Sequence, residues 1–121
     1  MSAHVLLVED EVNMAKTQAK ILQRKGYEVD TACNGREALH LLDRAAFDVV
    51  ITDLKMPVMD GKQFLAMMRG NPRLQTIPVV IMSAATREWS GAHLEVEEVL
   101  TKPVDLEVLL TTVNRICAPR L

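Results

Sequence analysis

Aromatic side chains and cysteines are scarce in this chain of 121 residues. Its aromatic residues are Tyr27, Phe47, Phe64 and Trp89, and its cysteines are Cys33 and Cys117. So few aromatic rings argue against a surface that stacks on nucleic-acid bases. The two cysteines match no metal-binding spacing. Because isolated cysteines are most often small buried hydrophobic residues, we predict that burial for both.

A strong charge of one sign and long apolar runs are also lacking. The formal net charge is −2, and no run of Lys and Arg is present, which argues against direct binding of nucleic acid. The apolar runs have the length of strands, not of membrane helices. The beginning, MSAHVLLVEDE, lacks the cationic lead and apolar stretch of a signal peptide. We therefore expect one soluble, cytoplasmic domain over residues 1–121.

Short apolar runs rich in β-branched residues alternate with longer helical patterns along the chain. Strands are predicted at 5–8, 27–32, 47–52, 77–82 and 96–101, and helices at 12–25, after Asn34, after Asp60 and at 105–117. This alternation predicts an α/β fold, a doubly wound (βα)₅ sandwich of the flavodoxin-like type with helices on both faces of a parallel sheet. Right-handed crossovers favour the strand order 2-1-3-4-5.

The predicted helices have recognisable starts and apolar faces. Glu11, Asn34 and Asp60 are expected to cap the helices that follow them. The last helix is expected to bury Leu106, Leu109, Leu110, Val113 and Ile116.

Polar residues follow the strands that this order makes neighbours. Glu9, Asp10 and Glu11 follow the first strand, Asp53 the third, Ser83 the fourth, and Lys102-Pro103 the fifth. Strand 2, at the far edge, ends in Thr31-Ala32. Since ligands bind at the carboxyl ends of strands in such folds, we expect the polar groups to meet at one edge of the sheet.

Several carboxylates that converge at one place repel each other unless a cation or a proton intervenes. Oxygen ligands without His or Cys favour a hard ion, and a small site with few protein ligands suits Mg²⁺ better than Ca²⁺. Such a site would allow phosphoryl transfer to a carboxylate, with Asp53 as the nucleophile that forms an acyl phosphate. Mg²⁺, Lys102 and the Ser83 hydroxyl would then stabilise the three phosphoryl oxygens.

Four segments in this order, LLVEDE, VVITDLKMPVMDG, VVIMSAA and LTKP, carry a resemblance that covers Val5 to about Cys117. The chain closely resembles the receiver domain of two-component response regulators. The resemblance implies that Asp53 accepts a phosphoryl group from a histidine kinase or a histidine phosphotransfer domain. It also implies that Glu9 and Asp10 form an acidic pocket, and that Asp10, Asp53 and the backbone carbonyl of Lys55 hold Mg²⁺.

By the same resemblance, Ser83 is the switch hydroxyl, Lys102 is the phosphate partner, and the Lys102-Pro103 bond is expected to be cis. The domain would be a signalling switch that catalyses its own phosphorylation and dephosphorylation rather than a conventional enzyme. Its partners would be the kinase and an unidentified downstream protein or effector domain. Receiver domains often pair when phosphorylated, so the sequence leaves open whether this chain forms a homodimer.

Two departures from the family pattern concern the output of the switch. Val99 stands where the family usually has Tyr or Phe, and the segment from Ser83 to Lys102 is a few residues shorter than usual, with Gly91-Ala92 as the remnant of a Gly-Ala-x-x-Tyr pattern. Trp89 in this segment would serve either a partner surface or the core. Lys55 and Ala85 flank the site and are expected to tune the lifetime of the aspartyl phosphate.

Three other functions compete with this one. A degenerate receiver that only binds partners is the alternative, although Asp10, Asp53, Ser83 and Lys102 argue against a loss of chemistry. A phosphatase of the haloacid dehalogenase type needs a second acid two residues after its nucleophile, where this chain has Lys55. A nucleotide-binding domain needs a glycine-rich motif after the first strand, and the sequence has none there.

Overall fold

The computed structural model describes residues 2–84 and 95–118. The elements are β1 (His4–Val8), α1 (Val12–Arg24), β2 (Glu28–Ala32), α2 (Gly35–Arg44), β3 (Val49–Asp53), α3 (Gly61–Arg69), β4 (Val79–Ser83), β5 (Glu98–Thr101) and α4 (Leu106–Ile116). These confirm the type and order of the predicted elements, with bounds that differ by one or two residues. Residues 85–94 lie outside the described ranges. The predictions for Ala85, Trp89 and Gly91-Ala92, and the helix that the (βα)₅ pattern implies between β4 and β5, concern these residues.

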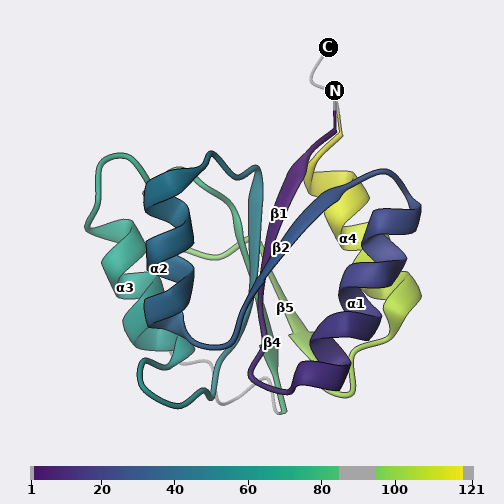
Figure 1. The fold of residues 1–121 in the computed structure, drawn as a ribbon, viewed down its shortest axis with the longest axis horizontal. Helices are drawn as coiled ribbons and strands as arrows, with labels where there is room; N and C mark the ends of the chain where they lie inside the picture. The colour runs from purple at the N-terminus through teal and green to yellow at the C-terminus, as the bar shows by residue number, and fades with distance from the viewer. Residues whose placement is uncertain (1, 85–94, 119–121) are drawn as a thin grey trace.

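The five strands form one parallel sheet in the order β2-β1-β3-β4-β5. Helices α2 and α3 cover one face of this sheet, and α1 and α4 cover the other (Figure 1). The predicted fold class and strand order are therefore confirmed. Because all strands run in the same direction, their carboxyl ends lie at one edge, with Asp53 level with Met82 and Ser83 level with Thr101.

The core lies on both faces of the central strands β1, β3 and β4, which are almost wholly buried. This explains their continuous apolar runs, since parallel strands covered on both faces have no solvent side. In α4, Leu109 and Val113 are buried as predicted, but Leu106, Leu110 and Ile116 are only partly buried. These three positions flank the buried stripe of the helix. The prediction that all five side chains are buried was therefore wrong for these three. Among the described residues, no helix is long and apolar enough to cross a bilayer.

The predicted helix caps are confirmed. The Glu11 carboxylate accepts hydrogen bonds from the N–H groups of Asn13 and Met14, and Asn34 accepts one from the Glu37 N–H. Asp60 forms a reciprocal capping box at the start of α3. Each cap satisfies N–H groups that the helix leaves open and contributes about 1 kcal/mol. Glu11 and Asp60 therefore serve as caps.

The prediction that both cysteines are buried was wrong. Cys33 is exposed, and Cys117 is only partly buried. The Cys33 Sγ lies 3.2 Å from Oε2 of Glu37, one helical turn further along the chain. Cys33 follows the edge strand β2, most of whose residues are poorly covered, and this position explains its exposure.

A buried amide on α1 gives the first testable prediction. Gln18 is 1% exposed, its Nε2 donates to the Met82 Sδ at 3.7 Å, and its Oε1 has no partner among the described residues. A buried acceptor without a hydrogen bond costs about 1–3 kcal/mol. We expect Gln18→Leu, which keeps the volume similar, to raise the free energy of unfolding in urea by about 1 kcal/mol.

The matched control is Gln23→Leu on the same helix, because Gln23 is exposed. This change should alter the free energy of unfolding by less than about 0.5 kcal/mol. A loss of stability in Gln18→Leu would show that the amide contributes more than its unpaired oxygen costs.

Candidate acidic site at the carboxyl edge of the sheet

The predicted site residues lie at the carboxyl ends of four neighbouring strands. Glu9 and Asp10 follow β1, Asp53 and Ser83 end β3 and β4, and Lys102 follows β5. Glu9, Asp53 and Ser83 are buried, whereas Asp10 is exposed. One carboxylate oxygen from each of Glu9, Asp10 and Asp53 lies within 4.8 Å of the other two. The structure therefore brings the three acids together.

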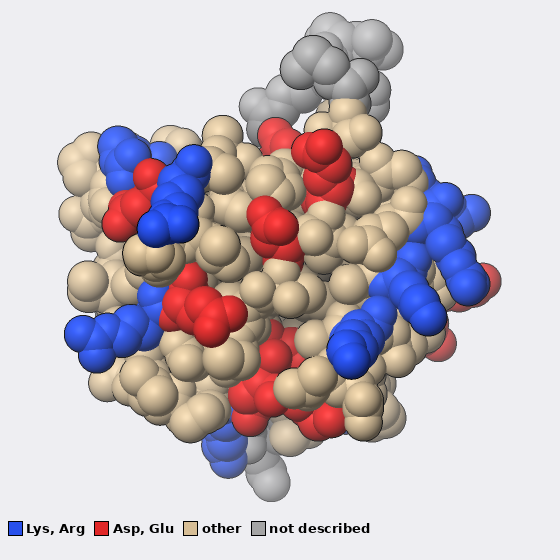
Figure 2. Space-filling model, viewed as in Figure 1, with Lys and Arg blue, Asp and Glu red and all other residues tan. Residues whose placement is uncertain are grey.

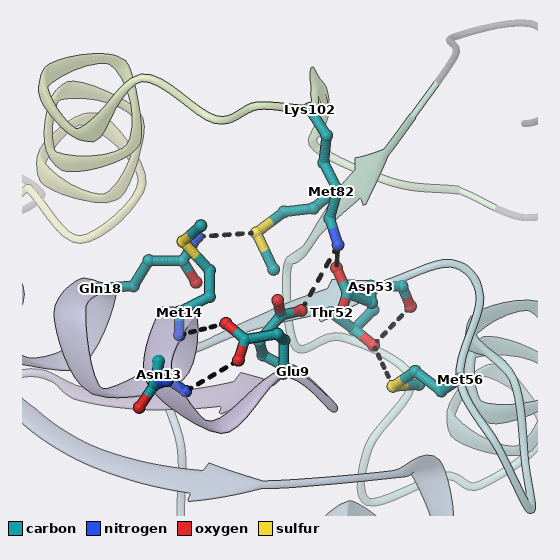
Figure 3. Close-up of polar contacts among 10 residues, drawn as sticks. Glu9, Asn13, Met14, Gln18, Thr52, Asp53, Met56, Met82 and Lys102 are labelled. Carbon is teal, nitrogen blue, oxygen red and sulfur yellow. Dashed lines mark hydrogen bonds and ion pairs between the residues drawn. The ribbon is translucent and has the colours of Figure 1, made fainter.

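Lys102 is the cation of this site. Its Nζ lies 2.6 Å from Oδ1 of Asp53 and 3.6 Å from Oε2 of Glu9 (Figure 3). The Lys102 N–H also donates to the Ser83 carbonyl at 2.7 Å, which fixes the base of the lysine beside β4. The peptide bond from Lys102 to Pro103 is cis, as predicted. The side chain of Lys102 is 35% exposed. It therefore extends from the solvent-facing surface to the two buried carboxylates.

Burial raises the pKa of the Asp53 carboxyl above its ordinary value. The hydrogen bond and charge of Lys102 and a backbone hydrogen bond from Asp10 oppose this rise in pKa. Apart from Lys102 and this backbone contact, the two Asp53 oxygens and Oε2 of Glu9 have no hydrogen-bond partner among the described residues. Three acids against one lysine leave room for a further positive charge.

The donor set at this edge fits Mg²⁺. The three carboxylates offer hard oxygen atoms that lie close together, and among the described residues Lys102 is the only side-chain donor to the buried Asp53 oxygens. Mg²⁺ is usually bound through one or two carboxylates with water in its other positions, which an exposed Asp10 allows. Lys55 is exposed in the loop after β3, and the role of its carbonyl as a ligand stays a prediction.

The loop from β3 to α3 is shaped by close backbone contacts. The Gly61 N–H donates to the Leu54 carbonyl at 2.7 Å. A Cβ atom at position 61 would lie 2.3 Å from the Asp53 carbonyl oxygen. The Met59 N–H donates to the Pro57 carbonyl at 2.7 Å, and Val58 between them has a φ of 69°. Gly61 therefore lets α3 begin directly against the end of the strand that carries Asp53.

Two features of the site were missed by the sequence reasoning. Val58 has a positive φ, which is rare for a β-branched residue and has no local sequence signal. Thr52 is fully buried beside Asp53, and its hydroxyl donates to the Asp53 carbonyl at 3.0 Å. A threonine inside a run of buried apolar residues was a usable signal, because a buried hydroxyl needs a hydrogen-bond partner.

Val99, at the position expected to carry an aromatic switch residue, is partly buried in β5 and packs against the core cluster that contains Phe64. It lies level with Ile81 of β4. A β-branched side chain has few χ1 choices, so Val99 forms a fixed part of the core surface.

Residues 5–114 match the family described as the response regulator receiver domain. The chain belongs to this family. The receiver domain is similar to the chemotaxis response regulator CheY4 of Vibrio cholerae, with 35% identity, a TM-score of 0.89, and coverage of 96% of this chain and 99% of that chain. It is also similar to the receiver domain of a histidine kinase from Syntrophus aciditrophicus, with 32% identity, a TM-score of 0.87, and coverage of 95% and 89%.

A curated relative is the probable transcriptional regulator ycf29 of Porphyra purpurea, which is 33% identical over 119 residues. The match covers 96% of this chain but 57% of that protein. This receiver domain thus spans a little over half the length of the relative.

Proposed function

We propose that this receiver domain is a phosphorylation-dependent switch of a two-component system. Asp53 accepts a phosphoryl group from a histidine kinase or phosphotransfer protein in the presence of Mg²⁺, and the surface that a partner recognises then changes. The observation that carries this proposal is the 2.6 Å contact between Nζ of Lys102 and the buried Asp53 carboxylate. A charged group at this position can stabilise the phosphoryl oxygens without further movement of the backbone.

In the transfer step, one Asp53 carboxylate oxygen attacks phosphorus and forms the new P–O bond. The bond between phosphorus and the donor's histidine nitrogen breaks, and that nitrogen keeps the electron pair. Lys102 would move from the carboxylate to a phosphoryl oxygen, and the Ser83 hydroxyl would donate to another. A bound Mg²⁺, held by Asp10, Asp53 and the Lys55 carbonyl beside Glu9, would supply positive charge to the phosphoryl group. Because the chain itself is modified, it acts as a phosphoacceptor rather than as a conventional enzyme.

Exposed apolar side chains near this edge support contact with a donor protein. Val12 and Met14 lie in the first turn of α1, and Val58 lies in the loop after β3. Exposed apolar groups on a soluble domain often mark interaction sites. The downstream partner, and a homodimer that forms on phosphorylation, would bind to surfaces whose conformation changes when Asp53 is phosphorylated.

The proposal is tested by incubating the protein with Mg²⁺ and acetyl phosphate and measuring its intact mass. We expect a gain of one phosphoryl group, lost in Asp53→Asn and when the metal is chelated. The matched control is Asp60→Asn, since Asn also caps helices well and should keep both the fold and the adduct. If the folded wild type gains no mass, the alternative of a degenerate receiver that only binds partners replaces this proposal.

A further inference from the structure

A groove of about 450 Å³ runs between α1 and the edge strand β2. Ala15, Lys16, Ala19 and Lys20 line it from α1, and Ala32 and Cys33 line it from the end of β2. The floor is hollow because three of the apolar positions along it are alanines, whose side chains fill little space. This volume is within the range of small-molecule sites, which combine an apolar lining with a few placed polar groups.

The charges around the groove are unequally distributed. Lys16 and Lys20 stand one turn apart on α1 and are both exposed. Within the described residues, no ion pair reaches either lysine. Figure 2 shows Lys and Arg gathered over α1, to the right of the acidic side chains at the centre of the view. Two like charges at this spacing repel, and an anion between them would relieve the repulsion.

The opposite wall offers the neutral or hydrogen-bonding groups of Thr31 and Cys33 and the carboxylate of Glu37. Thr31 and Cys33 are exposed there, and the Cys33 thiol donates to Glu37 at 3.2 Å. Glu9, which also lines the groove, is buried, and its Oε2 already lies 3.6 Å from the Lys102 ammonium group. An anionic group is therefore favoured only at the lysine wall, with an apolar body over the alanines.

We propose that this groove binds a small amphipathic anion, a carboxylate, sulfonate or phosphate on a compact apolar body. The anionic group lies between Lys16 and Lys20, and the apolar body covers Ala15, Ala19 and Ala32. This site is separate from the phosphorylation chemistry, although Glu9 borders both, so its test does not depend on the proposed function.

The probe is 8-anilinonaphthalene-1-sulfonate, an anionic aromatic amphiphile, added to the full chain and followed by fluorescence. We expect saturable binding of one molecule. The double variant Lys16→Gln/Lys20→Gln should bind roughly tenfold more weakly, since two exposed ion pairs are lost. The control Arg24→Gln/Lys25→Gln removes the same charge from the end of α1 outside the groove lining and should bind as the wild type does. N-phenyl-1-naphthylamine, which lacks the sulfonate, should also bind roughly tenfold more weakly.

Cys33 provides a second readout at the site itself. Alkylation of Cys33 by iodoacetamide, measured by peptide mass, should slow at saturating probe, while Cys117, which does not line the groove, should react at an unchanged rate. Equal weakening in the two double variants, or no protection of Cys33, would overturn the proposal. Protection of Cys33 by raised protein concentration without probe would also overturn it, because a second copy of the chain would then cover the groove.

Discussion

Gly61→Ala is expected to lower the free energy of unfolding by roughly 3 kcal/mol or more. A Cβ atom there would lie 2.3 Å from the Asp53 carbonyl oxygen and 2.8 Å from the Leu54 Cα. Both are backbone atoms, so the clash is relieved only if α3 moves away from the end of β3. That movement would also break the 2.7 Å hydrogen bond from the Gly61 N–H to the Leu54 carbonyl.

The cause of this effect is lack of space, and Gly70→Ala is the control that isolates it. At Gly70 the nearest atom to an added Cβ is the Ala66 carbonyl oxygen at 3.4 Å, which is an ordinary contact. The φ of Gly70 is −84°, which any residue adopts. We expect Gly70→Ala to change stability by less than about 1 kcal/mol, with a gain favoured by the reduced freedom of the unfolded chain.

Urea unfolding followed by circular dichroism measures both glycine variants. The fraction of Gly61→Ala that stays folded should also accept the phosphoryl group more slowly, since the end of β3 carries Asp53. Similar stabilities for the two variants would mean that the loop after β3 adapts at little cost and that Gly61 does not hold α3 in place.

The strand order and the acidic site were predictable because they follow from patterns repeated along the chain. Five apolar runs separated by helices allow few parallel topologies. Once the order is fixed, Glu9, Asp53, Ser83 and Lys102 must lie at one edge. The two roles of aspartate in the β3–α3 segment could also be separated, because capping needs a residue directly before a helix, as Asp60 is.

Burial and backbone strain of single residues were not predictable in the same way. Glu9 and Asp10 are adjacent acids, yet one is buried beside Lys102 and the other is exposed. Cys33 is exposed because β2 lies at the sheet edge, and Val58 has its positive φ because Pro57 and Met59 close a tight turn. Each outcome depends on contacts between distant segments or on loop geometry, and the residue type alone does not determine it.

Lys102→Met is expected to lower the free energy of unfolding by about 2–4 kcal/mol at neutral pH without divalent ions. The change leaves the carboxylates of Glu9 and Asp53, which are 3% and 1% exposed, without their cation. The loss is smaller than for a fully buried pair because Lys102 is 35% exposed. Lys25→Met, at an exposed position, is the control and should change stability by less than about 0.5 kcal/mol.

The loss of stability in Lys102→Met should depend on pH in a defined direction. Burial already holds the pKa of Asp53 above its ordinary value, and Lys102 is the main opposing cause, so its removal raises this pKa further. The folded protein then binds a proton more tightly than the unfolded chain, and stability increases as the pH falls. The destabilisation is complete above the folded-state pKa of Asp53 and diminishes as the pH falls toward the ordinary carboxyl value.

A double-mutant cycle with Asp53→Asn shows which charge Lys102 balances. Asp53→Asn alone should stabilise the metal-free protein, because burial disfavours the ionised Asp53 carboxylate and two further acids lie close to it, whereas Asn carries no charge. In Asp53→Asn/Lys102→Met the cost of losing the lysine should fall by more than half, and what remains reflects Glu9 at 3.6 Å. Urea unfolding at several pH values measures all four proteins. A loss in Lys102→Met that is the same at every pH, and the same when Asp53→Asn is also present, would mean that Lys102 stabilises the fold through the packing of its aliphatic chain, and that the buried acids are balanced by other means.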